Sequence, residues 1–172
     1  KEEERFVRGK GRILVMDDEE PVREVAREML ESLGYTVSLA RDGQEAIAIY
    51  RSGIESGEPF DSVIMDLTIP GGMGGMETVR RIAEMDSKVK AIVCSGYSND
   101  TIMADFRSHG FRGVVPKPYS LKQLSETVSE VLSTPACTPA GRVRGEGRPR
   151  SAGIARRLFQ GLPDPLERHG EL

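Results

Sequence analysis

Five short apolar runs, each followed by a helix-like pattern, constrain the fold of this chain more than any other feature. They are residues 12–16, 35–39, 89–94 and 112–116, together with a run between Pro59 and Pro70. Short apolar runs bounded by turn-forming residues are typical of buried strands. Regular alternation of such strands with helices predicts an α/β fold, in which helices cover both faces of a parallel sheet.

Amphipathic spacing and capping residues predict the helices. Apolar residues at spacings of three and four follow Pro21 and stop at Gly34, which indicates a helix with a C-terminal glycine. Two N-termini are predicted where a capping residue precedes Glu or Gln by three positions, at Asp42 with Glu45 and at Ser120 with Gln123. The helix that begins at Asp42 is expected over residues 43–54. Further helices are expected around Met76, Val79 and Ile82, and from a cap at Ser98 or Asn99 to a stop at Gly110.

Pro116 limits the position of the last predicted strand. Proline has no backbone N–H, so this strand is expected to lie at an edge of the sheet or to end there. Right-handed crossovers leave few other arrangements of five parallel strands.

Charge and composition divide the 172 residues into segments. Residues 1–11 are charged and glycine-containing, and are interpreted as a linker. Residues 1–134 hold 17 basic and 23 acidic residues, whereas residues 135–172 hold 7 and 4. Of the last 38 residues 11 are Gly or Pro, so 135–172 are predicted to be a mostly disordered basic tail. Its arginines are expected to be solvated, and no direct nucleic-acid binding is expected.

The same composition favours a cytoplasmic protein. No stretch approaches the roughly 20 apolar residues of a membrane-spanning helix, and the charged start is no signal peptide. We therefore expect no membrane insertion of this chain. Cys94 and Cys137 lie far apart, which indicates neither a disulfide framework nor a metal cluster. Because residue 1 is Lys rather than Met, we expect the chain to be a piece of a longer protein.

Polar residues follow the predicted strands at their carboxyl ends, where parallel α/β sheets bind ligands. These residues are Asp17, Asp18, Asp66, Ser95 and Lys117. Three neighbouring carboxylates need a compensating cation, or one of them must hold a proton. An all-oxygen site suits Mg²⁺. A carboxylate can also attack phosphorus, with the lysine and the hydroxyl contacting phosphoryl oxygens, so the set is coherent as a phosphoryl site.

Structural alternatives exist for each of these residues. Asp17 and Asp18 could cap the following helix, Asp66 could be a turn or capping residue, Ser95 could form a turn, and Lys117 could be solvated. The glycine-rich loop 70–75 could be a flexible lead-in to a helix or a phosphate cradle. It lacks the Gly-Lys-Ser/Thr ending of a P-loop, which favours the lead-in.

Four segments, in this order, resemble the receiver domain of two-component response regulators. They are Met16-Asp17-Asp18-Glu19-Glu20, Met65-Asp66-Leu67-Thr68-Ile69-Pro70, Cys94-Ser95-Gly96-Tyr97 and Val115-Pro116-Lys117-Pro118-Tyr119. The resemblance defines a receiver domain over residues 12–134, most similar to the C-terminal receiver of a hybrid sensor histidine kinase. It implies a flavodoxin-like, doubly wound five-stranded sheet in the order 2-1-3-4-5.

The resemblance also implies the roles of the site residues. Asp66 would be the phosphoacceptor, and Mg²⁺ would be held by Asp17, Asp18, Asp66 and the backbone carbonyl of Thr68. Ser95 and Lys117 would contact the phosphoryl group, and the Lys117-Pro118 bond would be cis. The implied partner is a histidine kinase or a histidine phosphotransfer domain, and a homodimer is left open.

The sequence departs from the resemblance in two places. Val114 stands where many receivers carry an aromatic residue that reports phosphorylation, and the loop 70–75 is longer and richer in glycine than expected. Two other functions compete with phosphoacceptance. A receiver-like interaction module without phosphorylation would not need the acids and the lysine, and an aspartyl-phosphate hydrolase would need a second carboxylate where Thr68 stands. No kinase core is recognised, so the only catalysis expected of this chain is its own phosphorylation and dephosphorylation.

Overall fold

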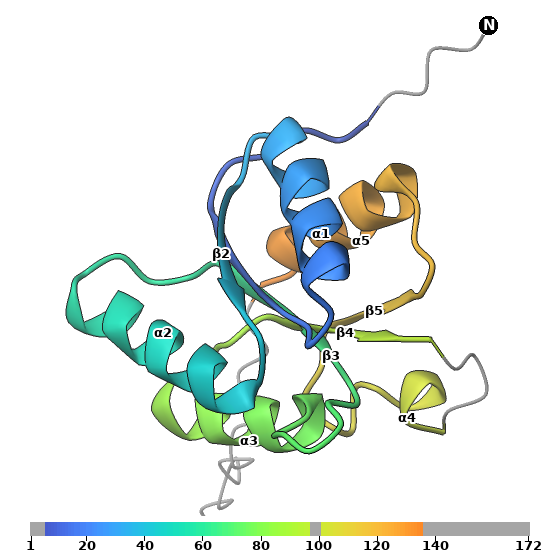
Figure 1. The fold of residues 1–172 in the computed structure, drawn as a ribbon. Helices are drawn as coiled ribbons and strands as arrows, with labels where there is room; N and C mark the ends of the chain where they lie inside the picture. Colours follow the sequence, from blue (N-terminus) through green and yellow to red (C-terminus); the bar gives the residue numbers. More distant parts are fainter. Residues whose placement is uncertain (1–5, 97–100, 136–172) are drawn as a thin grey trace, which may run out of the picture. The chain divides into compact units, whose positions relative to one another are not determined.

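The fold is a five-stranded parallel sheet with helices on both faces, as predicted (Figure 1). The structure is a computed structural model that describes residues 6–96 and 101–135. Its strands are β1 (Arg12–Met16), β2 (Thr36–Ala40), β3 (Ser62–Asp66), β4 (Ala91–Ser95) and β5 (Gly113–Pro116). They lie in the order β2-β1-β3-β4-β5, which is the predicted order and places β5, with Pro116 at its end, on an edge.

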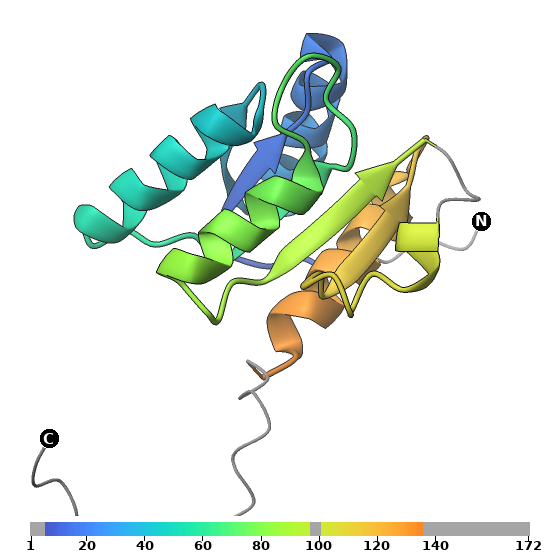
Figure 2. The ribbon, with the colours of Figure 1, turned by 90° about the horizontal axis from the view of Figure 1, so that it is seen from below.

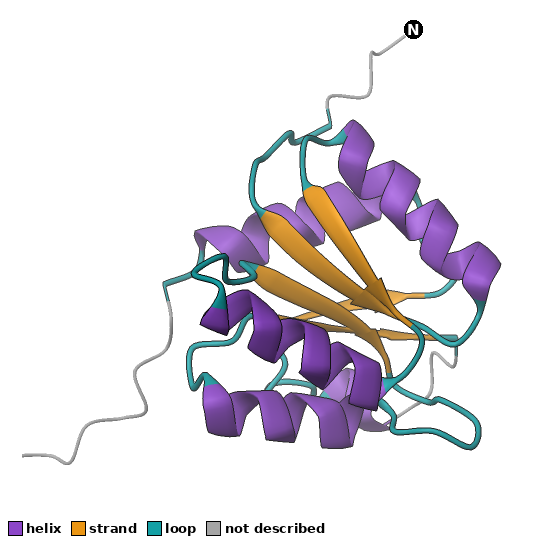
Figure 3. Cartoon of the chain, turned by 60° about the vertical axis from the view of Figure 1, so that its left-hand side comes forward, coloured by secondary structure: helices purple, strands orange, loops and turns teal. Residues whose placement is uncertain are grey.

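Five helices cover the sheet within the described residues. They are α1 (Glu20–Ser32), α2 (Gly43–Glu55), α3 (Gly75–Met85), α4 (Thr101–Ala104) and α5 (Leu121–Ser133). Apolar residues of α1 and α5 pack with one face of the sheet, and those of α2 and α3 pack with the other. Figure 2 shows α2, α3 and α4 on the same side, and Figure 3 shows the sheet enclosed between the two helical layers.

Capping residues behave largely as their sequence pattern predicts. Asp42 is the N-cap of α2 and its side chain accepts a hydrogen bond from Glu45 N, 2.9 Å away. Ser120 and Gln123 form a complete capping box at α5. Gly34 follows α1 with a φ of +102°, a backbone conformation that side chains disfavour. These local signals fix where the helices begin and end.

The helix predicted to stop at Gly110 is much shorter than expected. α4 ends at Ala104, and its predicted caps, Ser98 and Asn99, lie outside the described residues. The Ser108 hydroxyl donates to both the carbonyl and the carboxylate of Asp105, and the backbone continues in three-residue turns up to Gly110. Side-chain bonds of this kind compete with helical backbone bonds, which explains the early end.

Residues of the predicted linker pack on the sheet domain. Gly9 N donates to the carbonyl of Leu33 over 2.9 Å, and Thr36 N donates to that of Gly11 over 2.8 Å. A Cβ on Gly34 would lie 2.4 Å from the Gly9 carbonyl oxygen, so this approach requires glycine. The segment before β1 is therefore docked from Gly9 onward, while residues 1–5 and the predicted tail beyond Pro135 lie outside the described residues.

No helix in the part of the chain that the structure describes is long and apolar enough to span a membrane.

Candidate functional site

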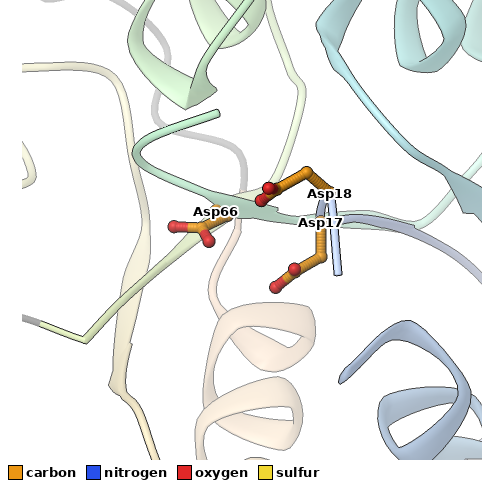
Figure 4. A group of neighbouring side chains, drawn as sticks. All are labelled: Asp17, Asp18 and Asp66. Atoms are coloured by element: carbon orange, nitrogen blue, oxygen red, sulfur yellow. The ribbon is translucent and has the colours of Figure 1, made fainter. Parts of the chain in front are cut away.

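The carboxyl ends of β1 and β3 bring three aspartates together. The two strands pair in parallel, with Met16 opposite Met65, so the residues that follow them share one edge of the sheet. Carboxylate oxygens of Asp17, Asp18 and Asp66 lie within 4.8 Å of one another (Figure 4). The sequence predicted this cluster, and parallel pairing of the two neighbouring strands is its cause.

The turn after β1 fixes Asp17 more firmly than Asp18. Asp17 is 3% exposed, its Oδ1 accepts a hydrogen bond from Glu19 N over 3.0 Å, and its carbonyl accepts one from the Arg23 guanidinium over 2.5 Å. Asp18 is exposed. The N-cap of α1 is Glu19, and no side chain caps this helix, so the capping alternative for Asp18 is wrong.

Lys117 joins two of the three carboxylates. Its Nζ lies 2.6 Å from Asp66 Oδ2 and also donates to Asp17 Oδ2. The side chains of Lys117 and Asp66 are only 16% and 13% exposed. Burial lowers the pKa of Lys117, but hydrogen bonds and attraction from Asp17 and Asp66 outweigh burial and raise this pKa above its ordinary value. The lysine is therefore an ammonium at neutral pH, and the solvated alternative is wrong.

The net negative charge at this edge favours the binding of a further cation. Three carboxylates face a single ammonium group, which contacts two of them. The oxygen-only ligand set fits Mg²⁺, which takes one or two carboxylates and keeps several waters. Asp17, Asp18 and Asp66 are the side chains that would hold the ion.

Ser95 reaches the same edge from β4. In the paired strands Cys94 lies opposite Asp66 and Ser95 opposite Pro116, so Ser95 stands between β3 and the start of the Lys117 loop. Ser95 is buried, and its carbonyl accepts a hydrogen bond from Lys117 N over 2.8 Å. The next peptide bond, Lys117-Pro118, is cis, as the resemblance implied.

The loop after Asp66 leads into α3. Thr68 is exposed, and its N–H donates to Asp66 Oδ1 over 3.3 Å. Gly74 is the N-cap of α3, which confirms the helix lead-in. Cβ atoms on Gly74 and Gly75 would lie 2.5 Å from the Leu67 carbonyl oxygen and 2.7 Å from that of Asp66. These two glycines permit close backbone packing, a role that the sequence reasoning missed although two adjacent glycines before a helix could have indicated it.

Three other features near the site carry information beyond the sequence pattern. Arg23 was missed, because nothing in its spacing shows that it reaches back to the Asp17 carbonyl. Val114 is partly buried and packs with the core cluster on the α2 and α3 face. An apolar groove of about 560 Å³ adjoins Lys117, and it is lined by Glu19, Pro21, Val22, Val25, Gly96, Lys117, Pro118 and Tyr119.

Comparisons with known proteins agree with this geometry. The model of the response regulator receiver domain matches residues 13–129. The chain is 36% identical over 124 residues to the sensor kinase CckA of Brucella abortus, which covers 72% of the chain and 13% of the kinase. It is 32% identical to the protein CcdB of Bacillus subtilis, over 70% of the chain and 97% of that protein.

A solved structure is also similar to this chain in sequence and fold. The response regulator protein TrrA of Thermotoga maritima, crystallised in complex with Mg(2+)-BeF, superposes with a TM-score of 0.61 and 32% identity, over 70% of this chain and 97% of that one. The chain thus spans a small part of the sensor kinase and nearly all of the single-domain relatives. With the strand order and the flavodoxin-like fold of CheY, it belongs to the response regulator receiver domain family, the phosphoacceptor domains of two-component signalling.

Proposed function

We propose that Asp66 is the residue of this receiver that accepts the phosphoryl group. The observation that carries the proposal is the carboxylate of Asp66, which lies within the acidic cluster and 2.6 Å from Lys117 Nζ. A carboxylate so placed has a cationic neighbour for the charge that develops on transferred phosphoryl oxygens.

The transfer would move a phosphoryl group from a phosphohistidine. A carboxylate oxygen of Asp66 attacks phosphorus and forms an O–P bond, the N–P bond to imidazole breaks, and the imidazole nitrogen keeps the electron pair. Lys117, freed from Asp66 Oδ2, contacts one phosphoryl oxygen, and the Ser95 hydroxyl contacts another. Hydrolysis by water then returns the carboxylate and releases phosphate.

Asp17, Asp18, Asp66 and the Thr68 carbonyl are proposed to hold Mg²⁺. The bound ion would neutralise charge on the phosphoryl oxygens. Asp17 is the best-fixed of these ligands, since its carboxylate and its carbonyl both have hydrogen-bond partners from the start of α1. The related TrrA was crystallised in complex with Mg(2+)-BeF, which supports Mg²⁺ as the ion.

The donor is proposed to be a histidine kinase or a histidine phosphotransfer domain. The apolar groove beside Lys117 supports this partner, because it offers a largely apolar docking surface at the rim of the reactive carboxylate. We also propose a cytoplasmic location and a receiver domain over residues 12–134.

The test replaces Asp66 and, as a matched control, Asp61, which directly precedes β3. Asp66→Asn is expected to lose phosphorylation by a small-molecule phosphodonor with Mg²⁺, measured by intact mass. Asp61→Asn, at the opposite end of β3, is expected to keep it, because an amide oxygen can still accept the bond from Arg12 N. Phosphorylation of Asp66→Asn at the wild-type rate would refute the assignment.

A further inference from the structure

The N-terminus of α2 is tied to the loop that follows the phosphoacceptor strand. Gly43 is the first residue of α2, and its N–H donates to the Met73 carbonyl over 2.9 Å. The first N–H groups of a helix have no acceptor within the helix, so this one is available to a neighbouring segment. Figure 3 shows α2 and α3 side by side, which brings the start of α2 to the loop before α3.

Only glycine fits at this contact. A Cβ on residue 43 would lie 2.0 Å from Thr78 Oγ1, 2.7 Å from Met73 Cγ and 2.9 Å from the Met73 carbonyl oxygen. Gly43 has an ordinary helical backbone, so its lack of a side chain serves packing rather than conformation. Thr78 is fully buried and cannot move toward solvent.

Two further hydrogen bonds close the loop. Thr78 Oγ1 donates to the Gly74 carbonyl over 2.8 Å, and Gly75 N donates to the Leu67 carbonyl over 3.1 Å. Leu67 directly precedes Thr68. The segment 67–75 is thus a loop whose two ends are bonded to each other, and the N-terminus of α2 contacts it at Met73.

We infer that Gly43 is a positioning residue for the metal site, acting through Met73 and Thr78 on the loop that carries the Thr68 carbonyl. This inference rests on the proposed role of that carbonyl as a Mg²⁺ ligand. A side chain at position 43 displaces Met73 and Thr78, shifts the loop 67–75 and misplaces the carbonyl, while Asp17, Asp18 and Lys117 stay where they are.

The test compares two glycine substitutions in the same helix. Gly43→Ala is expected to weaken Mg²⁺ binding by about tenfold to a hundredfold, the usual effect of removing an outer support of a metal ligand. Gly53→Ala is the control, because its Cβ would meet the Glu58 carbonyl oxygen and the Phe60 ring at 3.0 Å, far along α2 from the loop. It strains the helix but should leave the Mg²⁺ dissociation constant unchanged in the folded protein.

A second variant and a metal-free measurement keep the test decisive. Thr78→Val keeps the shape of the side chain and removes its bond to Gly74, and should also weaken Mg²⁺ binding. Without Mg²⁺, amide hydrogen exchange of residues 68–75 should be faster in Gly43→Ala and Thr78→Val than in Gly53→Ala. The inference is overturned if Gly43→Ala and Thr78→Val match Gly53→Ala in both readouts. If wild type itself binds no Mg²⁺, or Asp66→Asn is still phosphorylated, the proposed function fails instead.

Discussion

Lys117 and Asp66 are joined by an ion pair of 2.6 Å that crosses the end of β4. Lys117 follows β5, and its side chain passes the end of β4 to reach Asp66 on β3. The same ammonium group also contacts Asp17, which directly follows β1. This one cation therefore holds the acidic edge together when no metal is bound, and it competes with a metal for the same carboxylates.

Replacement of Lys117 should lower stability and raise metal affinity together. In Lys117→Met the carboxylates of Asp17 and Asp66 lose their ammonium partner. The free energy of unfolding in EDTA should therefore fall by about 2 kcal/mol. This loss is smaller than that for breaking a fully buried ion pair, because the edge is open to water. Mg²⁺ should bind several times more tightly, and phosphorylation should be lost. Urea unfolding and calorimetric titration measure the two effects.

A lysine outside the site serves as the control for this prediction. Lys122→Met changes an exposed lysine at the start of α5 and should alter neither the unfolding free energy in EDTA nor the Mg²⁺ affinity. Equal stability of Lys117→Met and wild type in EDTA would contradict the stabilising role of the ion pair.

Asp18 should behave in the opposite way to Lys117. Among the described residues Asp18 makes no ion pair, yet its carboxylate lies within 4.8 Å of those of Asp17 and Asp66. Asp18→Asn removes a repulsion and should raise the free energy of unfolding in EDTA by about 0.5 to 1 kcal/mol, since the exposed position is well screened. The same variant should bind Mg²⁺ more weakly. A variant that is less stable than wild type in EDTA would show that Asp18 has a structural role.

Much of the fold could be predicted because its strands are buried on both faces. The run 12–16 has no polar alternation, and every residue from Ile13 to Met16 is buried. Boundaries shifted by one or two residues where pairing extends past the apolar run, as at Ser95, which still pairs with Pro116. The wrong length of the helix before Gly110 has a side-chain cause, because bonds of Ser108 to Asp105 replace helical ones.

The site could be predicted as a set of residues but not as a set of contacts. Strand order alone brings Asp17 and Asp66 to one edge, since β1 and β3 are neighbours. Which acids Lys117 reaches depends on the twist of the sheet and on side-chain torsions, which leave no pattern in the sequence. The contact of Gly43 with Met73 was hidden for another reason: a glycine at the start of a helix is unremarkable until its neighbour is known.

Cys94 should be inert toward thiol reagents in the folded protein. It is buried in β4, and burial raises the pKa of its thiol to about 12. Since the thiolate is the reactive form, labelling of Cys94 should be at least roughly a hundredfold slower than that of a free thiol. The measurement uses Cys137→Ser, which removes a cysteine outside the described residues, with and without urea. Labelling at the same rate in both conditions would contradict the burial of Cys94.

Wild type should lose stability at alkaline pH because of Tyr50, and the variant Tyr50→Phe should not show this loss. Tyr50 is only 1% exposed, and its ring stacks on Phe60. Its hydroxyl donates to Asp86 Oδ2 over 2.8 Å. Burial, then the hydrogen bond and charge of Asp86, raise the pKa of Tyr50 above its ordinary value. Tyr50→Phe should lose about 1 kcal/mol of unfolding free energy at pH 7, the usual net value of such a bond.

The sign of the pH effect follows from the raised pKa of Tyr50. Below about pH 10 the tyrosine is neutral in both states, so the advantage of wild type over Tyr50→Phe is constant. Above that pH the unfolded tyrosine ionises while the folded one stays neutral, and wild type loses stability by about 1.4 kcal/mol per pH unit relative to the variant. The unfolding free energies of wild type and Tyr50→Phe should therefore become equal at about pH 11. Urea unfolding across this range measures them, and a difference that persists unchanged to pH 11 would show that Tyr50 ionises equally in both states.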